Sequence, residues 1–154
     1  MLRELPQIAA DLDALTPSDF DYRNPAGHAR ERLKALCDEL VALNEPAACA
    51  PILFALMERL DSADLGSPGP LVHTLEQWNG EHETLLAESV GRKPTPLSLW
   101  MVNRILNANP PDGAQWLKLL VAVTEDPTAS AEAKADARQF IDYQTRSGRG
   151  GTRA

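Results

Sequence analysis

Apolar residues recur three or four positions apart along most of the chain, which is the spacing of one face of an α-helix. Between residues 25 and 44, for example, an apolar stripe includes Leu33, Leu36 and Leu40, and charged side chains fill most of the other positions. No segment shows the sustained apolar and polar alternation of a half-buried strand bounded by Asn-Gly or Asp-Gly turns. The pattern therefore predicts an all-α protein.

Prolines and capping residues mark where these helices begin and end. Asn24-Pro25 and Thr95-Pro96 each place a capping side chain before a proline at the first helical position, and Ser130 precedes the last helix. We expect Pro51 to limit its helix to about residues 50–61, because proline is tolerated in the first turn and not inside a helix. About eight helices are expected, over residues 1–15, 25–44, 50–61, 68–79, 81–90, 97–107, 113–124 and 130–144.

Short turns between successive helices favour antiparallel neighbours. The segment 97–107 is apolar on nearly every side, so we expect it to be a central helix. The even alternation of helix and turn in the second half favours a HEAT-like short α-solenoid, and an irregular helical bundle is the alternative because no strict repeat is visible. The length fits a single helical domain over residues 1–145, followed by a basic Gly/Arg tail, 146–154, whose composition indicates disorder.

The formal charge of −7 is unevenly distributed. The tail carries three arginines and no acidic residue, so residues 1–145 hold 12 basic and 22 acidic side chains, a net charge of −10. An acidic body repels nucleic acid and attracts basic protein surfaces. We therefore expect a basic protein partner and no nucleic-acid partner.

The chain begins without the basic stretch and apolar run of an export signal, and no apolar span approaches the ~18 residues of a membrane helix. Its two cysteines, Cys37 and Cys49, lack CxxC spacing and are expected to be buried free thiols. These features predict a cytoplasmic protein with no membrane partner.

Motifs of recognised catalytic sites are missing from the sequence, which contains no Walker loop, GxGxxG or GxSxG. His82-Glu83 begins like a zinc-protease helix, but Leu86 occupies the position of the second histidine. Two histidines alone make a poor metal site. We expect no catalytic residue, no metal and no cofactor; an enzyme with a site around His73, His82 and Glu76 is the alternative.

Two stretches together resemble a known group of proteins: Leu65-Gly-Ser-Pro-Gly-Pro-Leu-Val-His73 and Arg92-Lys-Pro-Thr-Pro-Leu-Ser-Leu-Trp-Met-Val-Asn-Arg-Ile-Leu-Asn107. Over about residues 50–125, the chain is similar to small helical immunity proteins of bacterial polymorphic toxin systems, including contact-dependent inhibition and Rhs-type loci. The resemblance implies that the chain binds and neutralises one cognate toxin domain, such as a nuclease, in the producer's cytoplasm. A helical adaptor that binds a non-toxin protein is the alternative.

In such families the shared motif is largely structural and the toxin-facing surface varies, so candidate contacts come from acidic loops and helix faces. We predict that the partner is contacted by Asp61, Asp64, His73, Glu76, Glu81, Glu83 and Glu88. A second acidic group near the N-terminus comprises Asp11, Asp13, Asp19 and Asp21. By contrast, we expect the polar residues Asn103, Arg104 and Asn107 to satisfy loop carbonyls and helix ends between packed hairpins.

Overall fold

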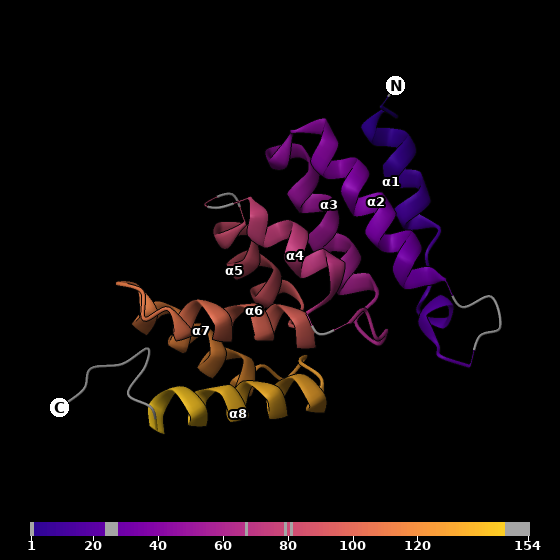
Figure 1. The fold of residues 1–154 in the computed structure, drawn as a ribbon. Coiled ribbons are helices and arrows are strands. Elements are labelled where there is room, and N and C mark those ends of the chain that lie inside the picture. The colour runs from indigo at the N-terminus through magenta and orange to yellow at the C-terminus, as the bar shows by residue number, and fades with distance from the viewer. Residues whose placement is uncertain (1, 24–27, 67, 79, 81, 147–154) are drawn as a thin grey trace. The chain divides into compact units, whose positions relative to one another are not determined.

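Eight α-helices and one short 3-10 helix make up the computed structural model, which describes residues 2–23, 28–66, 68–78, 80 and 82–146 (Figure 1). No strand occurs among the described residues, so the predicted all-α fold is confirmed. The chain groups into two compact units, unit 1 over residues 1–85 and unit 2 over residues 86–154. The choice between a HEAT-like solenoid and a bundle stays a prediction, as does the single domain over 1–145.

Unit 1 is built around two helices that each contact the same two neighbours. It contains α1 (Leu5–Asp13), η1 (Pro17–Phe20), α2 (Ala29–Leu43), α3 (Pro46–Arg59), α4 (Gly69–Gln77) and the start of α5 (Glu83–Arg92). Both α2 and α3 contact α1 and α4, and Figure 1 shows α1 lying along α2. The core of these helices is mostly aliphatic: Ile8, Leu33, Leu40, Leu53 and Leu71 have no exposed surface, and the aromatic Phe54 of α3 is buried with 1% exposed.

The start of α3 differs from the prediction, because Pro51 lies inside the helix. α3 begins at Pro46, the first helical position, where a proline's missing N–H would have no partner in any case. Cys49 and Ala50 are completely buried, so apolar packing holds the first turns in helical form. Pro51 is exposed, and so is Ala47, whose carbonyl loses its helical donor and lies within reach of water.

The ends of α2 follow local backbone chemistry. The predicted cap, Asn24-Pro25, lies outside the described residues, and His28 is the N-cap residue of α2. The predicted end near Asn44 is confirmed, because Asn44 adopts a left-handed conformation with φ of 55° that terminates the helix. Asp19, which falls between the helices predicted over residues 1–15 and 25–44, lies in the 3-10 turn η1.

Unit 2 contains the remainder of α5 together with α6 (Pro96–Asn107), α7 (Gly113–Glu125) and α8 (Ala131–Arg146). The last three helices contact one another (Figure 1). α6 buries Leu99 and Val102 completely, while Trp100 is half-buried, so the helix is covered on most of its surface. The predicted cap of α8 is confirmed, since Ser130 Oγ accepts the N–H of Ala133 at 3.0 Å.

Three further expectations concern the C-terminal tail, the thiols and membrane helices. Arg146 is the last residue of α8, and the rest of the predicted disordered tail, 147–154, lies outside the described residues. Both Cys37 and Cys49 are free and buried, as predicted. Within the described ranges, no helix combines the length and apolar character needed to cross a membrane.

Candidate functional site

The acidity of the chain is concentrated in unit 1. Residues 1–85 carry 6 basic and 15 acidic side chains, a net charge of −9, whereas residues 86–154 carry 9 basic and 7 acidic side chains, a net charge of +2. No lysine or arginine occurs between Arg59 and Arg92, the stretch that holds every predicted contact residue. Unit 1 is therefore the part of the chain that attracts a basic surface.

The predicted contact residues are spread over one loop and two helices. Asp61 and Asp64 lie in the loop before α4, His73 and Glu76 lie on α4, and Glu83 and Glu88 lie on α5. Of these six residues, Glu76 is half-buried and the other five are exposed, and Glu81 lies outside the described residues.

Two of these residues, Glu83 and Glu88, lie on different sides of one helix. Positions five apart on an α-helix are about 140° apart around its axis, so Glu83 and Glu88 do not share one line along α5. Glu88 also belongs to unit 2, whereas the other five described residues belong to unit 1. A common role as partner contacts stays a prediction.

Asp64 is held by α2. Its Oδ2 lies 2.6 Å from Arg30 Nη2, and its backbone carbonyl accepts Arg30 Nε at 3.1 Å. Its Oδ1 accepts the N–H of Gly66 at 3.1 Å and so fixes the turn in which Gly66 has a φ of +103°. A basic partner that reached Asp64 would compete with Arg30 for the same carboxylate.

Two adjoining cavities lie beside η1 and the first turn of α2. Their volumes are about 290 and 430 Å³, and their linings share Phe20, Asp21, Tyr22 and Arg30. We call the pair the η1 groove, which is lined by residues 17–23, 29–31 and 62–64. Of the predicted contact residues, Asp64 lies here.

Tyr22 lines both hollows of this groove and is not among the predicted contact residues. The residue is 91% exposed, more than the other exposed large hydrophobic residues of the described chain, Leu2, Val121 and Tyr143. The guanidinium of Arg23 lies 5.5 Å from the ring centroid. Asp21 holds Arg23 through contacts of 3.2 and 3.3 Å and also accepts its backbone N–H at 2.9 Å. These hydrogen bonds from Arg23 lower the pKa of Asp21. The only sequence signal for this arrangement is a tyrosine placed between opposite charges after a helix break.

A second groove, of about 380 Å³, lies between α2 and α4 and contains His73. Its lining includes Cys37, and burial raises the pKa of that thiol to about 11, so the thiol stays protonated at neutral pH and is a poor nucleophile. His82 and Glu76 are not among the residues that line it. His82 is buried, with Nδ1 3.3 Å from the carbonyl oxygen of Trp78. The groove therefore does not bring together the three residues of the enzymatic alternative.

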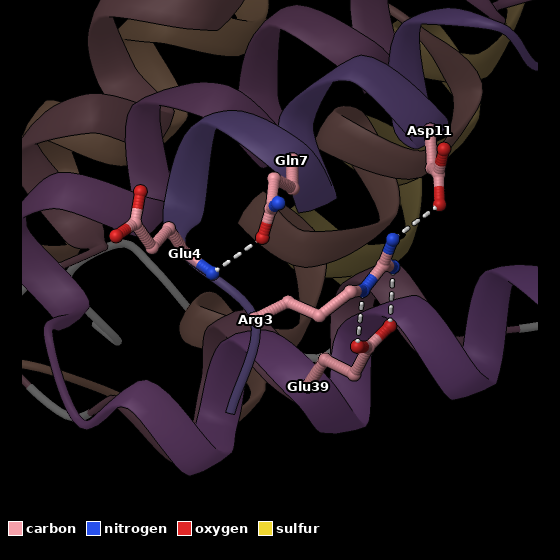
Figure 2. Close-up of polar contacts among 5 residues, drawn as sticks. All are labelled: Arg3, Glu4, Gln7, Asp11 and Glu39. Carbon is pink, nitrogen blue, oxygen red and sulfur yellow. Dashed lines mark hydrogen bonds and ion pairs between the residues drawn. The ribbon is translucent and has the colours of Figure 1, made fainter. Parts of the chain in front are cut away.

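The second acidic group is partly engaged within unit 1. Figure 2 shows Arg3 between Asp11 of α1 and Glu39 of α2. Arg3 donates from Nη1 to Asp11 at 2.8 Å, and from Nε and Nη2 to the two oxygens of Glu39, each at 2.8 Å. This two-pronged contact holds the pKa of Glu39 below its usual range. In the same view the N–H of Glu4 donates to Gln7 Oε1 at 3.0 Å, at the start of α1 (Figure 2).

The segment 92–107 is built into unit 2. Thr95 and Ser98 are 1% and 0% exposed and form a reciprocal capping box at the start of α6. Thr95 Oγ1 accepts the N–H of Ser98 at 3.2 Å, and Ser98 Oγ accepts the N–H of Thr95 at 3.0 Å. This part of the segment stabilises a helix start.

The polar residues farther along α6 are also used internally. Gln144 of α8 is completely buried and donates from Nε2 to the side-chain oxygens of Asn103 at 2.7 Å and Asn107 at 2.8 Å. Arg104 lies over the ring of Trp100, 5.0 Å from its centroid. Asn103 and Asn107 are thus engaged inside unit 2, as expected, but with the side-chain amide of Gln144 and not with loop carbonyls or helix ends.

Among the described residues, no group of three or more His, Cys, Asp or Glu side chains is arranged to hold a metal ion. Comparison of the chain with known proteins found no matching family model, no matching curated protein and no matching solved structure.

Proposed function

We propose that the chain is an immunity protein that binds one toxin domain with a basic surface and blocks the toxin's active site or substrate surface. The observation that carries the proposal is the net charge of −9 in unit 1. Opposite charges on two proteins raise their association rate and disfavour partners of the same sign. Nucleases and other toxins that act on polyanions present the basic clefts that such a surface fits.

The resemblance of residues 65–73 and 92–107 to immunity proteins supports a toxin as the partner. Both segments contribute to a turn, a capping box or packing in this chain, so we assign them to the scaffold. The toxin would meet the acidic surface of unit 1, in the producer's cytoplasm. In this proposal the chain performs no catalysis and binds no metal, cofactor, nucleic acid or membrane.

The direct test is growth rescue. The toxin domain encoded by the gene immediately upstream is expressed alone and together with the chain. We expect growth arrest in the first case and growth in the second. The proposal is wrong if the upstream product is not toxic, or if its toxicity persists in the presence of the chain. In that case, a different protein that copurifies with the chain would favour the adaptor alternative.

The charge argument has its own test, with matched variants. Asp61→Lys with Glu83→Lys reverses two exposed acids of unit 1, and Glu125→Lys with Glu132→Lys makes the same change in unit 2. The unit 1 pair should lower the association rate with the toxin domain by about tenfold and reduce its salt dependence. Equal effects of the two pairs would contradict a role for unit 1 in steering.

A further inference from the structure

We infer that the η1 groove is the docking site for a lysine- or arginine-bearing loop of the partner, with Tyr22 at its centre. This inference rests on the proposed function, because it takes the partner to be a basic protein. It assigns the contact to a region that includes Asp64 of the predicted contact residues, together with Asp19 and Asp21 of the second acidic group.

The shape of the groove is the first argument. Tyr22 lines both hollows and is 91% exposed, so a partner's side chain that enters either hollow can contact it. Tyrosine is enriched in the centres of protein interfaces, where a large ring is packed by the partner and kept from water. In the unbound chain, Tyr22 is exposed to solvent beside two hollows, so a partner that binds there would pack against its ring and shield it from water.

Preorganisation is the second argument. Asp21 holds Arg23 by a two-pronged contact and a backbone hydrogen bond, and Arg23 covers one face of the Tyr22 ring. A side chain that is already restrained loses less conformational entropy when a partner binds. The other side of the ring is available to a partner, since the residue as a whole is almost fully exposed.

Charge decides which partner fits. The carboxylates that line the groove outnumber the guanidinium groups; they belong to Asp19, Asp21, Glu31 and Asp64. The two guanidinium groups are already paired, Arg23 with Asp21 and Arg30 with Asp64. The lining therefore contains no unpaired cation that could bind an anion. A lysine or arginine can bind to the excess carboxylates and to the face of the Tyr22 ring. A second copy of unit 1, which also carries −9, is repelled.

The test uses the full chain, isotope-labelled for NMR, and a short Gly/Arg peptide as the probe. We expect saturable shift changes centred on the amides of Tyr22, Arg30 and Glu31. The same peptide with citrulline in place of arginine should cause none of them. Chemical-shift changes that spread evenly over the acidic residues of unit 1, or that centre on α5, would overturn the assignment. Shifts that depend on the concentration of the chain without peptide would also overturn it, because they indicate a second copy as the occupant.

Variants separate the ring from general charge. Tyr22→Ala should weaken peptide binding by at least about tenfold, and Tyr143→Ala, which removes an exposed tyrosine from unit 2, should leave it unchanged. Because Tyr22 is almost fully exposed, its replacement should preserve the circular dichroism spectrum. Equal binding by the two variants would refute a role for Tyr22.

Growth rescue by the same variants distinguishes this inference from the proposed function. A Tyr22→Ala chain that still neutralises the toxin with unchanged affinity would remove the docking site and leave the function standing. Arginine-dependent binding at the groove by a chain that neutralises no toxin would leave the site and remove the function.

Discussion

Replacing Thr95 by alanine should destabilise unit 2 by about 2 kcal/mol. Loss of an N-cap hydroxyl typically costs about 1 kcal/mol and at most about 2. Thr95 and Ser98 are 1% and 0% exposed, so water cannot replace the acceptor that the N–H of Ser98 loses. An unsatisfied buried donor costs about 1–3 kcal/mol, which places this cap at the upper end of the range.

The measurement is urea unfolding followed by tryptophan fluorescence, since Trp100 and Trp116 lie in unit 2. Thr95→Ala should lower the midpoint without changing the slope, because the surface exposed on unfolding stays the same. Thr95→Val, which keeps the shape and removes the hydroxyl, should behave like Thr95→Ala. Thr95→Ser keeps the hydroxyl and should lose much less stability.

A double-mutant cycle with Ser98→Ala tests whether the two side chains act as one unit. Thr95→Ala removes the acceptor of the Ser98 N–H, and Ser98→Ala removes the acceptor of the Thr95 N–H. Each change also removes the hydrogen bond between the two hydroxyls at 3.1 Å, so the double variant should lose less than the sum of the single losses, which counts that shared bond twice. The reasoning is refuted if Thr95→Ser costs as much as Thr95→Ala, or if the two losses add to within about 0.5 kcal/mol.

Three further predictions test other parts of the chain. Gly66→Ala should lower the free energy of unfolding by about 1–3 kcal/mol, because Gly66 has a φ of +103° and a Cβ there would lie 2.9 Å from the backbone of Gly69. Gly91→Ala should raise it by up to about 1 kcal/mol, because Gly91 has no positive φ and open space around a Cβ. Equal effects of the two changes on equilibrium unfolding would contradict this reasoning. Because Arg3 lowers the pKa of Glu39, their pairing stabilises the fold above the unfolded-state pKa of about 4.3 and is lost as the pH falls through the lower folded-state pKa. Arg3→Gln should return the NMR titration midpoint of Glu39 to its ordinary range and flatten the acid dependence of unfolding, and an unmoved midpoint would exclude Arg3 as the cause. Burial raises the pKa of Cys37 to about 11, so at about pH 8 this thiol should react with an aromatic disulfide reagent at least ~10-fold more slowly in the native chain than in urea; similar rates would mean that the thiol is accessible.

Helix positions were readable from the sequence because their signals are local. Thr95-Pro96 and Ser130 act within one turn of their own positions, and both function as predicted. The prediction for Pro51 is wrong because a proline inside a helix costs roughly 3 kcal/mol locally, and tertiary packing that a local pattern does not contain offsets this cost. The complete burial of Cys49 and Ala50 depends on helices elsewhere in the chain, so no window of sequence contains it.

The candidate site was less readable, because its decisive contacts join distant residues. The acidic excess follows from counting charged residues, and the sequence predicts two acidic groups, one between residues 61 and 88 and a second between residues 11 and 21. The pairs Arg3–Glu39 and Arg30–Asp64 join residues 36 and 34 positions apart, and they engage carboxylates that look available in the sequence. The exposure of Tyr22 is likewise set by how η1 and α2 fold beside it.

The buried amide of Gln144 fixes the register of α8 against α6. Small apolar residues such as Ala133 and Ala137 would tolerate a slide of one helical turn, about 5.4 Å, because apolar contacts are not directional. Such a slide would carry Gln144 away from Asn103 and Asn107 and strand a polar group in the core. Replacing Gln144 by leucine would relieve that requirement, so its main consequence is that α8 could dock on α6 in more than one alignment.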